Sequence, residues 1–228
     1  MPEDTLYAVP RISRSVTANG EILLKSEESL GSYPESLIEM LRSWASADSN
    51  HPLAAERTPD GGWSYCSYGQ ALAGANAIGQ ALLDRGLTRE SPLMILSDNS
   101  IGHLLMALGA LTVGVPVAPI SVAYSLRSQD HARIKAIQKL ISPGAVYVDD
   151  AEKFGGALAA LGSNVTLLAA HASPIGNSLD DLLGTKPLID VENAFERVTK
   201  NTIAKILFTS GSTGTPKGVV NTHPDFRI

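Results

Sequence analysis

Residues 93–120 read LMILSDNSIGHLLMALGALTVGVPVAPI, and this stretch decides the fold. The short apolar run at 93–96 predicts a buried strand. A helix is expected over about 100–113, and Gly114 is placed to end it. The second apolar run, at 115–120, predicts another buried strand. A strand, a helix and a strand in this order form a βαβ unit with two parallel strands.

Two more helices and a hairpin are expected before this unit. Residues 32–35 read SYPE, a capping-box pattern that predicts the start of a helix at Ser32. Strand-like runs at 53–58 and 63–68 flank the turn sequence PDGG, which predicts a hairpin. A second capping box, Ser67 with Gln70, opens a helix that is expected to end at Gly86.

The alternation of strands and helices continues after residue 120. Ser128 is a candidate cap for a helix with Ile134, Ile137, Leu140 and Ile141 facing inward. Residues 173–193 are mixed in character and are expected to form a surface connection with one short helix. Further strands are predicted at 145–148, 165–169 and 202–208, with a helix at 152–161. The sequence therefore predicts an α/β fold with a mostly parallel sheet and helices on both faces.

Composition excludes several classes of protein. The chain has 228 residues and a net charge of −5 with no basic block, which argues against a nucleic-acid-binding surface. The single cysteine, Cys66, forms no internal disulfide, and the N-terminus lacks the apolar core of a signal peptide, so we expect a cytoplasmic protein. Prolines and glycines interrupt the uncharged run at 99–126, which favours a buried helix and strand over a membrane span. The histidines lack the spacing of a metal site.

Near its C-terminus the chain reads ILFTSGSTGTPKGVV, residues 206–220. Glycines let backbone N–H groups approach an anion closely, hydroxyl side chains donate hydrogen bonds to phosphate oxygens, and a lysine supplies a positive charge. The stretch therefore predicts a phosphate-binding loop between two strands. Its candidate ATP-binding residues are Thr209, Ser210, Gly211, Ser212, Thr213, Gly214 and Lys217, and Lys217 is also the candidate catalytic residue.

The loop differs from the common nucleotide-binding motifs. The P-loop G-x-x-x-x-G-K-[ST] precedes a helix, whereas Lys217 is followed by Gly218 and a strand-like segment. No G-x-G-x-x-G fingerprint is present. The alternative interpretation is a surface loop with an incidental lysine. Two further residues have structural interpretations. His223 is expected to be a solvated or capping side chain, and Tyr124 a packing residue rather than a ligand contact.

TSGSTGTPKG at 209–218 resembles the signature loop of the adenylate-forming (AMP-binding) enzymes, which include acyl-CoA synthetases, luciferases and peptide-synthetase adenylation domains. The segments WSYCSYGQALAGANAIGQALLDRGL and PLMILSDNSIGHLLMALGALTVGVPVAPIS resemble the parts of that family that precede the loop. Within the superfamily, YPESL, ILSDNS and APISVAYSL are most similar to feruloyl-CoA synthases. The resemblance extends from about residue 22 to the end of the chain.

The resemblance implies an acid–thiol ligase. Members bind Mg²⁺ and ATP, and the carboxylate of an acid attacks the α-phosphorus so that pyrophosphate leaves. The acyl-adenylate then passes its acyl group to coenzyme A. By this resemblance, residues 209–213 hold the β- and γ-phosphates, Gly211 and Gly214 permit their close approach, and Lys217 neutralises the charge that develops on pyrophosphate. A hydroxycinnamate such as ferulate is the substrate that the resemblance favours.

The chain also lacks expected parts of that family. Members are typically more than twice as long, and a later glutamate motif, a ribose-binding aspartate and a C-terminal lysine have no counterpart here. We therefore expect residues 1–31 to form an N-terminal extension and 32–228 the first part of an AMP-binding domain, unable to complete the reaction alone. Two alternatives stay open: a fatty-acyl or other aryl-CoA ligase, and a non-catalytic half-domain that binds a nucleotide or a partner.

Overall fold

The computed structural model describes residues 9–29, 31–126, 130–163, 165–171, 177–209 and 216–226. The chain divides into two compact units, residues 1–33 and 34–228. In the described part of the first unit, β1 (Ile12–Val16) pairs antiparallel with β2 (Ile22–Ser26), and every residue of both strands is exposed.

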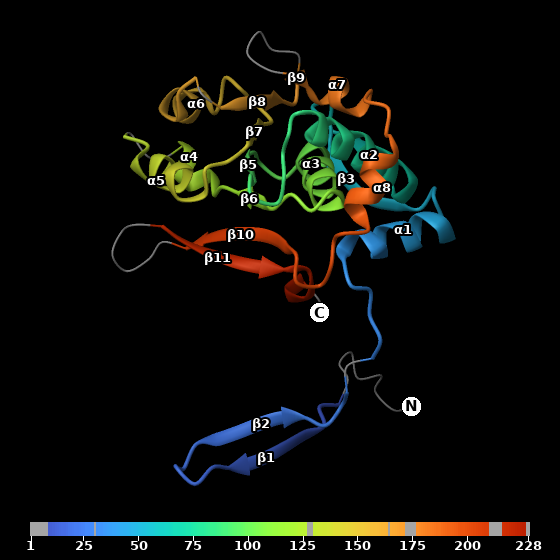
Figure 1. The fold of residues 1–228 in the computed structure, drawn as a ribbon, viewed down its shortest axis with the longest axis vertical. Helices are drawn as coiled ribbons and strands as arrows, with labels where there is room; N and C mark the ends of the chain where they lie inside the picture. The colour runs from blue at the N-terminus through green and yellow to red at the C-terminus, as the bar shows by residue number, and fades with distance from the viewer. Residues whose placement is uncertain are drawn as a thin grey trace. The chain divides into compact units, whose positions relative to one another are not determined.

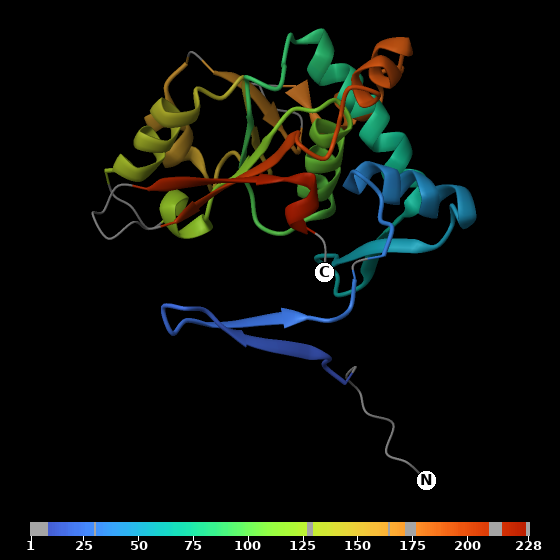
Figure 2. The ribbon, with the colours of Figure 1, turned by 60° about the horizontal axis from the view of Figure 1, so that its bottom comes forward.

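The second unit is built on a seven-stranded sheet with the strand order β11-β10-β6-β5-β7-β8-β9 (Figure 1). All neighbours are parallel except β10 and β11, which form an antiparallel hairpin (Figure 2). The predicted α/β fold with a mostly parallel sheet is confirmed. The strands are β5 (Leu93–Leu96), β6 (Val117–Pro119), β7 (Ala145–Val148), β8 (Thr166–Ala169), β9 (Asn177–Ser178), β10 (Ile203–Thr209) and β11 (Lys217–Thr222).

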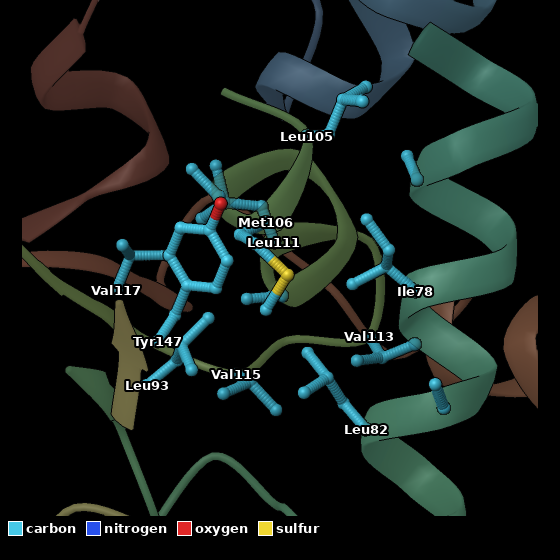
Figure 3. Close-up of a cluster of buried hydrophobic side chains, with 14 of the residues drawn as sticks. Ile78, Leu82, Leu93, Leu105, Met106, Leu111, Val113, Val115, Val117 and Tyr147 are labelled. Atoms are coloured by element: carbon cyan, nitrogen blue, oxygen red, sulfur yellow. The ribbon is translucent and has the colours of Figure 1, made fainter. Parts of the chain in front are cut away.

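The first face of the sheet is covered by α2 (Tyr68–Asp84) and α3 (Ile101–Thr112), with α1 (Leu37–Ala47), α7 (Leu179–Leu183) and α8 (Ile189–Phe195) around them. Leu93 of β5 and Tyr147 of β7 point into this core (Figure 3). Ile95 of β5 belongs to the same core. The hairpin of β3 (Pro52–Arg57) and β4 (Trp63–Ser67) forms a small separate sheet that leads into α2, as the turn sequence predicts.

The second face is covered by α4 (Val122–Leu126), α5 (Ala132–Ile141) and α6 (Gly155–Leu161), which Figure 1 shows grouped at one side. Met94 and Leu96 point to this face, while Leu93 and Ile95 point to the other. Burial on both faces explains why the parallel strands read as continuous apolar runs. None of the described helices is long and apolar enough to cross a membrane.

Helix starts at two of the predicted positions carry side-chain caps, and the capping box at Ser67 was expected from the sequence. The Ser67 hydroxyl accepts a hydrogen bond from the Gln70 backbone N–H at 3.2 Å, and the Gln70 side chain accepts one from the Ser67 N–H at 2.8 Å. Ser100 caps α3 by accepting from the His103 N–H at 3.0 Å. Gly86 follows the end of α2 with a φ of 73°, a backbone conformation that suits glycine.

Other predicted details were wrong. Helix α1 is capped by Ser36 and not Ser32, because the Ser36 hydroxyl accepts from the Glu39 N–H while the Glu39 carboxylate binds the Glu35 N–H. Helix α5 begins at Ala132 with His131 at its cap, later than the predicted start at Ser128, which lies outside the described residues.

Two predictions of burial were also wrong. Leu140 is exposed, since Ile134, Ile137 and Ile141 already form the apolar stripe of α5. The segment predicted as a surface connection with one short helix holds β9, α7 and α8, and it buries Leu182 and Val191 against the first face.

Candidate functional site

The parallel strands all end at one edge of the sheet, the carboxyl edge, where open α/β sheets bind ligands. At this edge β5 ends at Leu96, β6 at Pro119, β7 at Val148 and β10 at Thr209. The predicted phosphate loop follows Thr209, so it leaves the sheet at the edge where a ligand site is expected. The predicted loop residues Ser210, Gly211, Ser212, Thr213 and Gly214 lie outside the described residues.

The two ends of the loop are described, and they meet. Thr209 is paired with Lys217 in the ladder of β10 and β11, so the sheet brings two of the predicted site residues together. Residues directly opposite each other in an antiparallel pair share one face of the sheet. Lys217 is exposed, and within the described residues it makes no ion pair.

Gly218 approaches the side chains of β10 closely next to this pair. It lies opposite Phe208, and a Cβ at this position would be 3.2 Å from Cγ2 of Ile206 and 3.5 Å from the Phe208 ring. The motif's last glycine therefore lets β11 lie close against the side chains of β10.

A small cavity of about 190 Å³ lies beside the middle of β10, between β6 and the start of α3. Lys205, His103 and Ser100 line it. Burial lowers the pKa of the Lys205 ammonium. Burial also lowers the pKa of His103, with a contribution from the charge of Lys205, against the opposing effect of the Asp98 carbonyl that His103 contacts at 3.3 Å. Alternation along β10 puts Lys205 on the same face as Thr209, and therefore as Lys217.

A group of acidic side chains follows β5 and β7 at the same edge. The Asp149 carboxylate accepts hydrogen bonds from the Asp98 N–H at 2.8 Å and the Ser97 hydroxyl at 3.0 Å. The Lys153 ammonium is paired with Asp98. Sequence reasoning missed Lys205, His103 and this acidic group, although the polar residues that directly follow the apolar runs LMIL and AVYV were a usable signal.

Two side chains weighed in the sequence have clear places. Tyr124 is buried in the second core with the Arg133 guanidinium 5.0 Å from the centre of its ring, which agrees with a packing role. His223, predicted to be a solvated or capping side chain, is 1% exposed, so the solvated alternative was wrong. The chain enters the 3-10 helix η1 (His223–Phe226) directly after β11, and this turn puts the imidazole inside.

The sheet order and the helices on both faces define a class: an open α/β domain built on a mostly parallel sheet. The family model "AMP-binding enzyme" matches residues 41–226, and the chain belongs to this family. The structure aligns with a fatty acyl-adenylate ligase from L. pneumophila with a TM-score of 0.63 and 20% identity, over 82% of this chain and 30% of that one. The fold is that of the N-terminal part of adenylate-forming enzymes.

Curated relatives agree on the family and differ in reaction. The long-chain-fatty-acid–CoA ligase ACSBG2 of Mus musculus is 26% identical over 96% of this chain and 34% of its own length. The phenyloxazoline synthase MbtB of Mycolicibacterium paratuberculosis is 33% identical over 74% of this chain and 13% of its own length. The chain thus spans about a third or less of the length of these relatives.

Proposed function

We propose that this chain is the phosphate-binding part of an ATP-dependent acid–CoA ligase that activates a carboxylic acid. The observation that carries the proposal is the pairing of Thr209 with Lys217 at the carboxyl edge, at the two ends of a segment with the sequence SGSTGTP. Membership of the AMP-binding family supports ATP as the nucleotide.

In the proposed reaction the acid's carboxylate oxygen attacks the α-phosphorus of ATP, and the bond from that phosphorus to the bridging oxygen of pyrophosphate breaks. The leaving pyrophosphate carries concentrated negative charge, which positive side chains stabilise when they are already in place. Thr209 and the loop residues 210–214 hold the phosphates, and Lys217 stabilises the departing group. The thiol of coenzyme A then attacks the acyl carbon, and AMP leaves.

Mg²⁺ belongs to this proposal as the ion that accompanies ATP. Within the described residues no group of three or more His, Cys, Asp or Glu side chains is arranged to hold a metal. We therefore assign the ion to the phosphates of the nucleotide rather than to a carboxylate site of the described chain.

The proposed acid is a hydroxycinnamate such as ferulate, on the basis of the motifs YPESL, ILSDNS and APISVAYSL. The alternative substrate is a fatty acid, favoured by the 96% coverage of this chain in its match to the mouse ligase. Exchange of labelled pyrophosphate into ATP, with ferulate and dodecanoate in turn, tests these two acids, and benzoate tests the further alternative of another aryl acid. Stimulation by ferulate alone supports the hydroxycinnamate, and stimulation by dodecanoate alone refutes it.

A half-domain that binds ATP without catalysis is the second candidate, because the pairing of Thr209 with Lys217 supports phosphate binding without itself supplying a catalytic step. Calorimetric titration of the chain with Mg-ATP separates the two candidates. Saturable ATP binding with no acid-dependent exchange supports the binding half-domain. A folded chain that binds no ATP refutes the assignment of the loop itself.

A further inference from the structure

A second cavity, of about 460 Å³, opens at the carboxyl edge between the ends of β5, β7 and β8. Strand β6 lies between β10 and β5, so it separates the end of β10 from this cavity. Acidic side chains predominate in its lining. The carboxylates are Glu56, Asp98, Asp149, Asp150 and Asp180, and Lys153 is a basic side chain among them.

The carboxylates of this cavity outnumber the cations. Lys153 is paired with Asp98, and His171 is the other basic side chain of the described lining. Glu56 accepts a hydrogen bond from the Ile101 N–H at 2.7 Å, which fixes its carboxylate at the start of α3. Within the described residues neither Glu56 nor Asp149 forms an ion pair. The cavity is therefore suited to a positively charged ligand.

Two polar atoms of this lining are buried without a hydrogen-bond partner among the described residues. They are the Tyr147 hydroxyl and the Asp149 Oδ1. Tyr147 is 0% exposed, and Figure 3 shows its ring inside the first core with the oxygen pointing away from Leu93 and Val115. Alternation along the strand puts Tyr147 and Asp149 on one face of the sheet. Buried polar groups normally have a hydrogen-bond partner, so a bound ligand can supply the partner that these two atoms lack.

The surroundings keep the Tyr147 phenol in its neutral form. Burial raises the pKa of Tyr147 well above its usual value, and the charges of Asp149 and Glu56 raise it further. A neutral phenol oxygen and a carboxylate oxygen both accept hydrogen bonds from an ammonium group. Three acceptor groups, Tyr147, Asp149 and Glu56, therefore line one cavity.

An apolar cavity of about 520 Å³ shares part of this lining. Both cavities are lined by Glu56, Gly102 and Leu179. The 520 Å³ cavity is also lined by apolar side chains that include Leu105 and Leu183. Gly102 has no side chain to divide them: a Cβ there would be 2.5 Å from the Tyr147 oxygen. A ligand with a charged end and an apolar end can occupy both spaces.

We propose that this composite cavity binds a small organic cation, a primary amine in its ammonium form that carries an apolar group. The ammonium is received by Tyr147, Asp149 and Glu56, and the apolar group lies against Leu105, Leu179 and Leu183. A divalent metal is the less suitable occupant, because no described group of three or more potential ligand side chains is arranged for one. Neither Thr209 nor Lys217 lines this composite cavity, so the proposal does not rest on the proposed ligase reaction.

The test is calorimetric titration of the chain, without nucleotide, with 2-phenylethylammonium chloride at neutral pH. Two matched probes separate the contributions: 2-phenylethanol keeps the apolar group without the charge, and butylammonium keeps the charge with a smaller apolar group. We expect saturable 1:1 binding of the phenylethylammonium ion, weaker binding of butylammonium and no saturation by the alcohol. Equal binding of the alcohol, or no saturable binding of the amine, would overturn the proposal.

Two variants test the named atoms. Tyr147→Phe removes only the unpartnered hydroxyl, so we expect an unchanged or higher melting temperature together with about tenfold weaker amine binding. Asp149→Asn keeps the acceptor for Ser97 and Asp98 but removes the charge, and it should weaken binding by at least about tenfold. Asp190→Asn, on the exposed first turn of α8, is the control and should bind like the unchanged chain. Unaltered amine binding by a folded Tyr147→Phe chain would refute the site.

Discussion

Thr209 and Lys217 lie directly opposite each other in the antiparallel ladder of β10 and β11, at the end of β10 that reaches the carboxyl edge of the sheet. The segment between them is therefore closed at its base by backbone pairing. Closing a loop on a rigid hairpin reduces the conformational freedom that remains to be lost on binding. Lys217 is the first residue of β11, so its backbone is fixed while its side chain extends from an exposed position.

Replacing Lys217 with alanine tests the role of its charge. We expect Mg-ATP binding to weaken by about tenfold or more, because a charge-assisted hydrogen bond to phosphate is lost. The melting temperature should not change, since Lys217 makes no described ion pair. Calorimetry and thermal unfolding measure the two effects. Lys200→Ala, at an exposed turn, is the control, and equal ATP affinity in both variants would contradict the assignment.

Helices α2 and α3 pack closely because of Gly109. A Cβ at this position would be 2.6 Å from the Cβ of Ile78 and 3.3 Å from the Gly79 backbone nitrogen. We expect Gly109→Ala to lower the free energy of unfolding by about 1–3 kcal/mol, because the helices must separate to admit the methyl group. Urea denaturation measures it.

The matched control for that change is Gly155→Ala at the start of α6. Nothing lies within 4 Å of a Cβ at Gly155, and its φ is not positive. Alanine is also the better helix former, so this variant should be neutral or more stable by up to about 1 kcal/mol. Equal losses from both substitutions would show that the contact with Ile78 is not the cause.

Local signals predicted most of the second unit. The apolar run at 93–96 became β5 at those positions, and Ser67 with Gln70 forms the expected capping box, because both signals depend only on neighbouring residues. Ser36 shows the limit of such signals: two serines four residues apart both precede helix-forming sequence, and only the hydrogen bond of Ser36 to the Glu39 N–H identifies the cap.

The candidate sites were less predictable because they depend on strand order. Asp98 and Asp149 are 51 residues apart and meet only because β5 and β7 are neighbours, while β6 lies on the other side of β5. Residues 177–195 were underestimated for a related reason. Leu182 and Val191 have polar neighbours in the sequence. They are buried because their helices, α7 and α8, pack against α2.

The capping box at the start of α2 should make a measurable contribution. Ser67→Ala removes the acceptor for the Gln70 N–H and leaves a helix-terminal donor without its partner. We expect the free energy of unfolding to fall by about 1 kcal/mol, measured by urea denaturation. Ser46→Ala is the control, because Ser46 is exposed within α1 and alanine favours the helix. If Ser46→Ala costs as much, the capping interaction is not responsible for the loss.

Protonation of His103 should lower the free energy of unfolding in mild acid. Its pKa is lowered from the usual 6.5 in the folded chain, mainly by burial, so the unfolded chain binds the proton more readily. The contribution of this group is therefore fully present above about pH 6.5 and is lost as the pH falls toward the folded-state pKa. Between pH 7.5 and 5.5 the carboxylates with lowered pKa values, such as Asp181 and Glu192, stay ionised and add little.

Replacing His103 with glutamine should therefore reduce the loss of unfolding free energy between pH 7.5 and pH 5.5. Urea denaturation at both pH values measures the change, and the two-pH difference cancels any effect of the substitution that does not depend on protonation. His51→Gln is the control, because the His51 side chain, directly before β3, is 62% exposed. The burial of His103 beside Lys205 would be refuted as the cause if the His103 variant lost as much stability in acid as the unchanged chain.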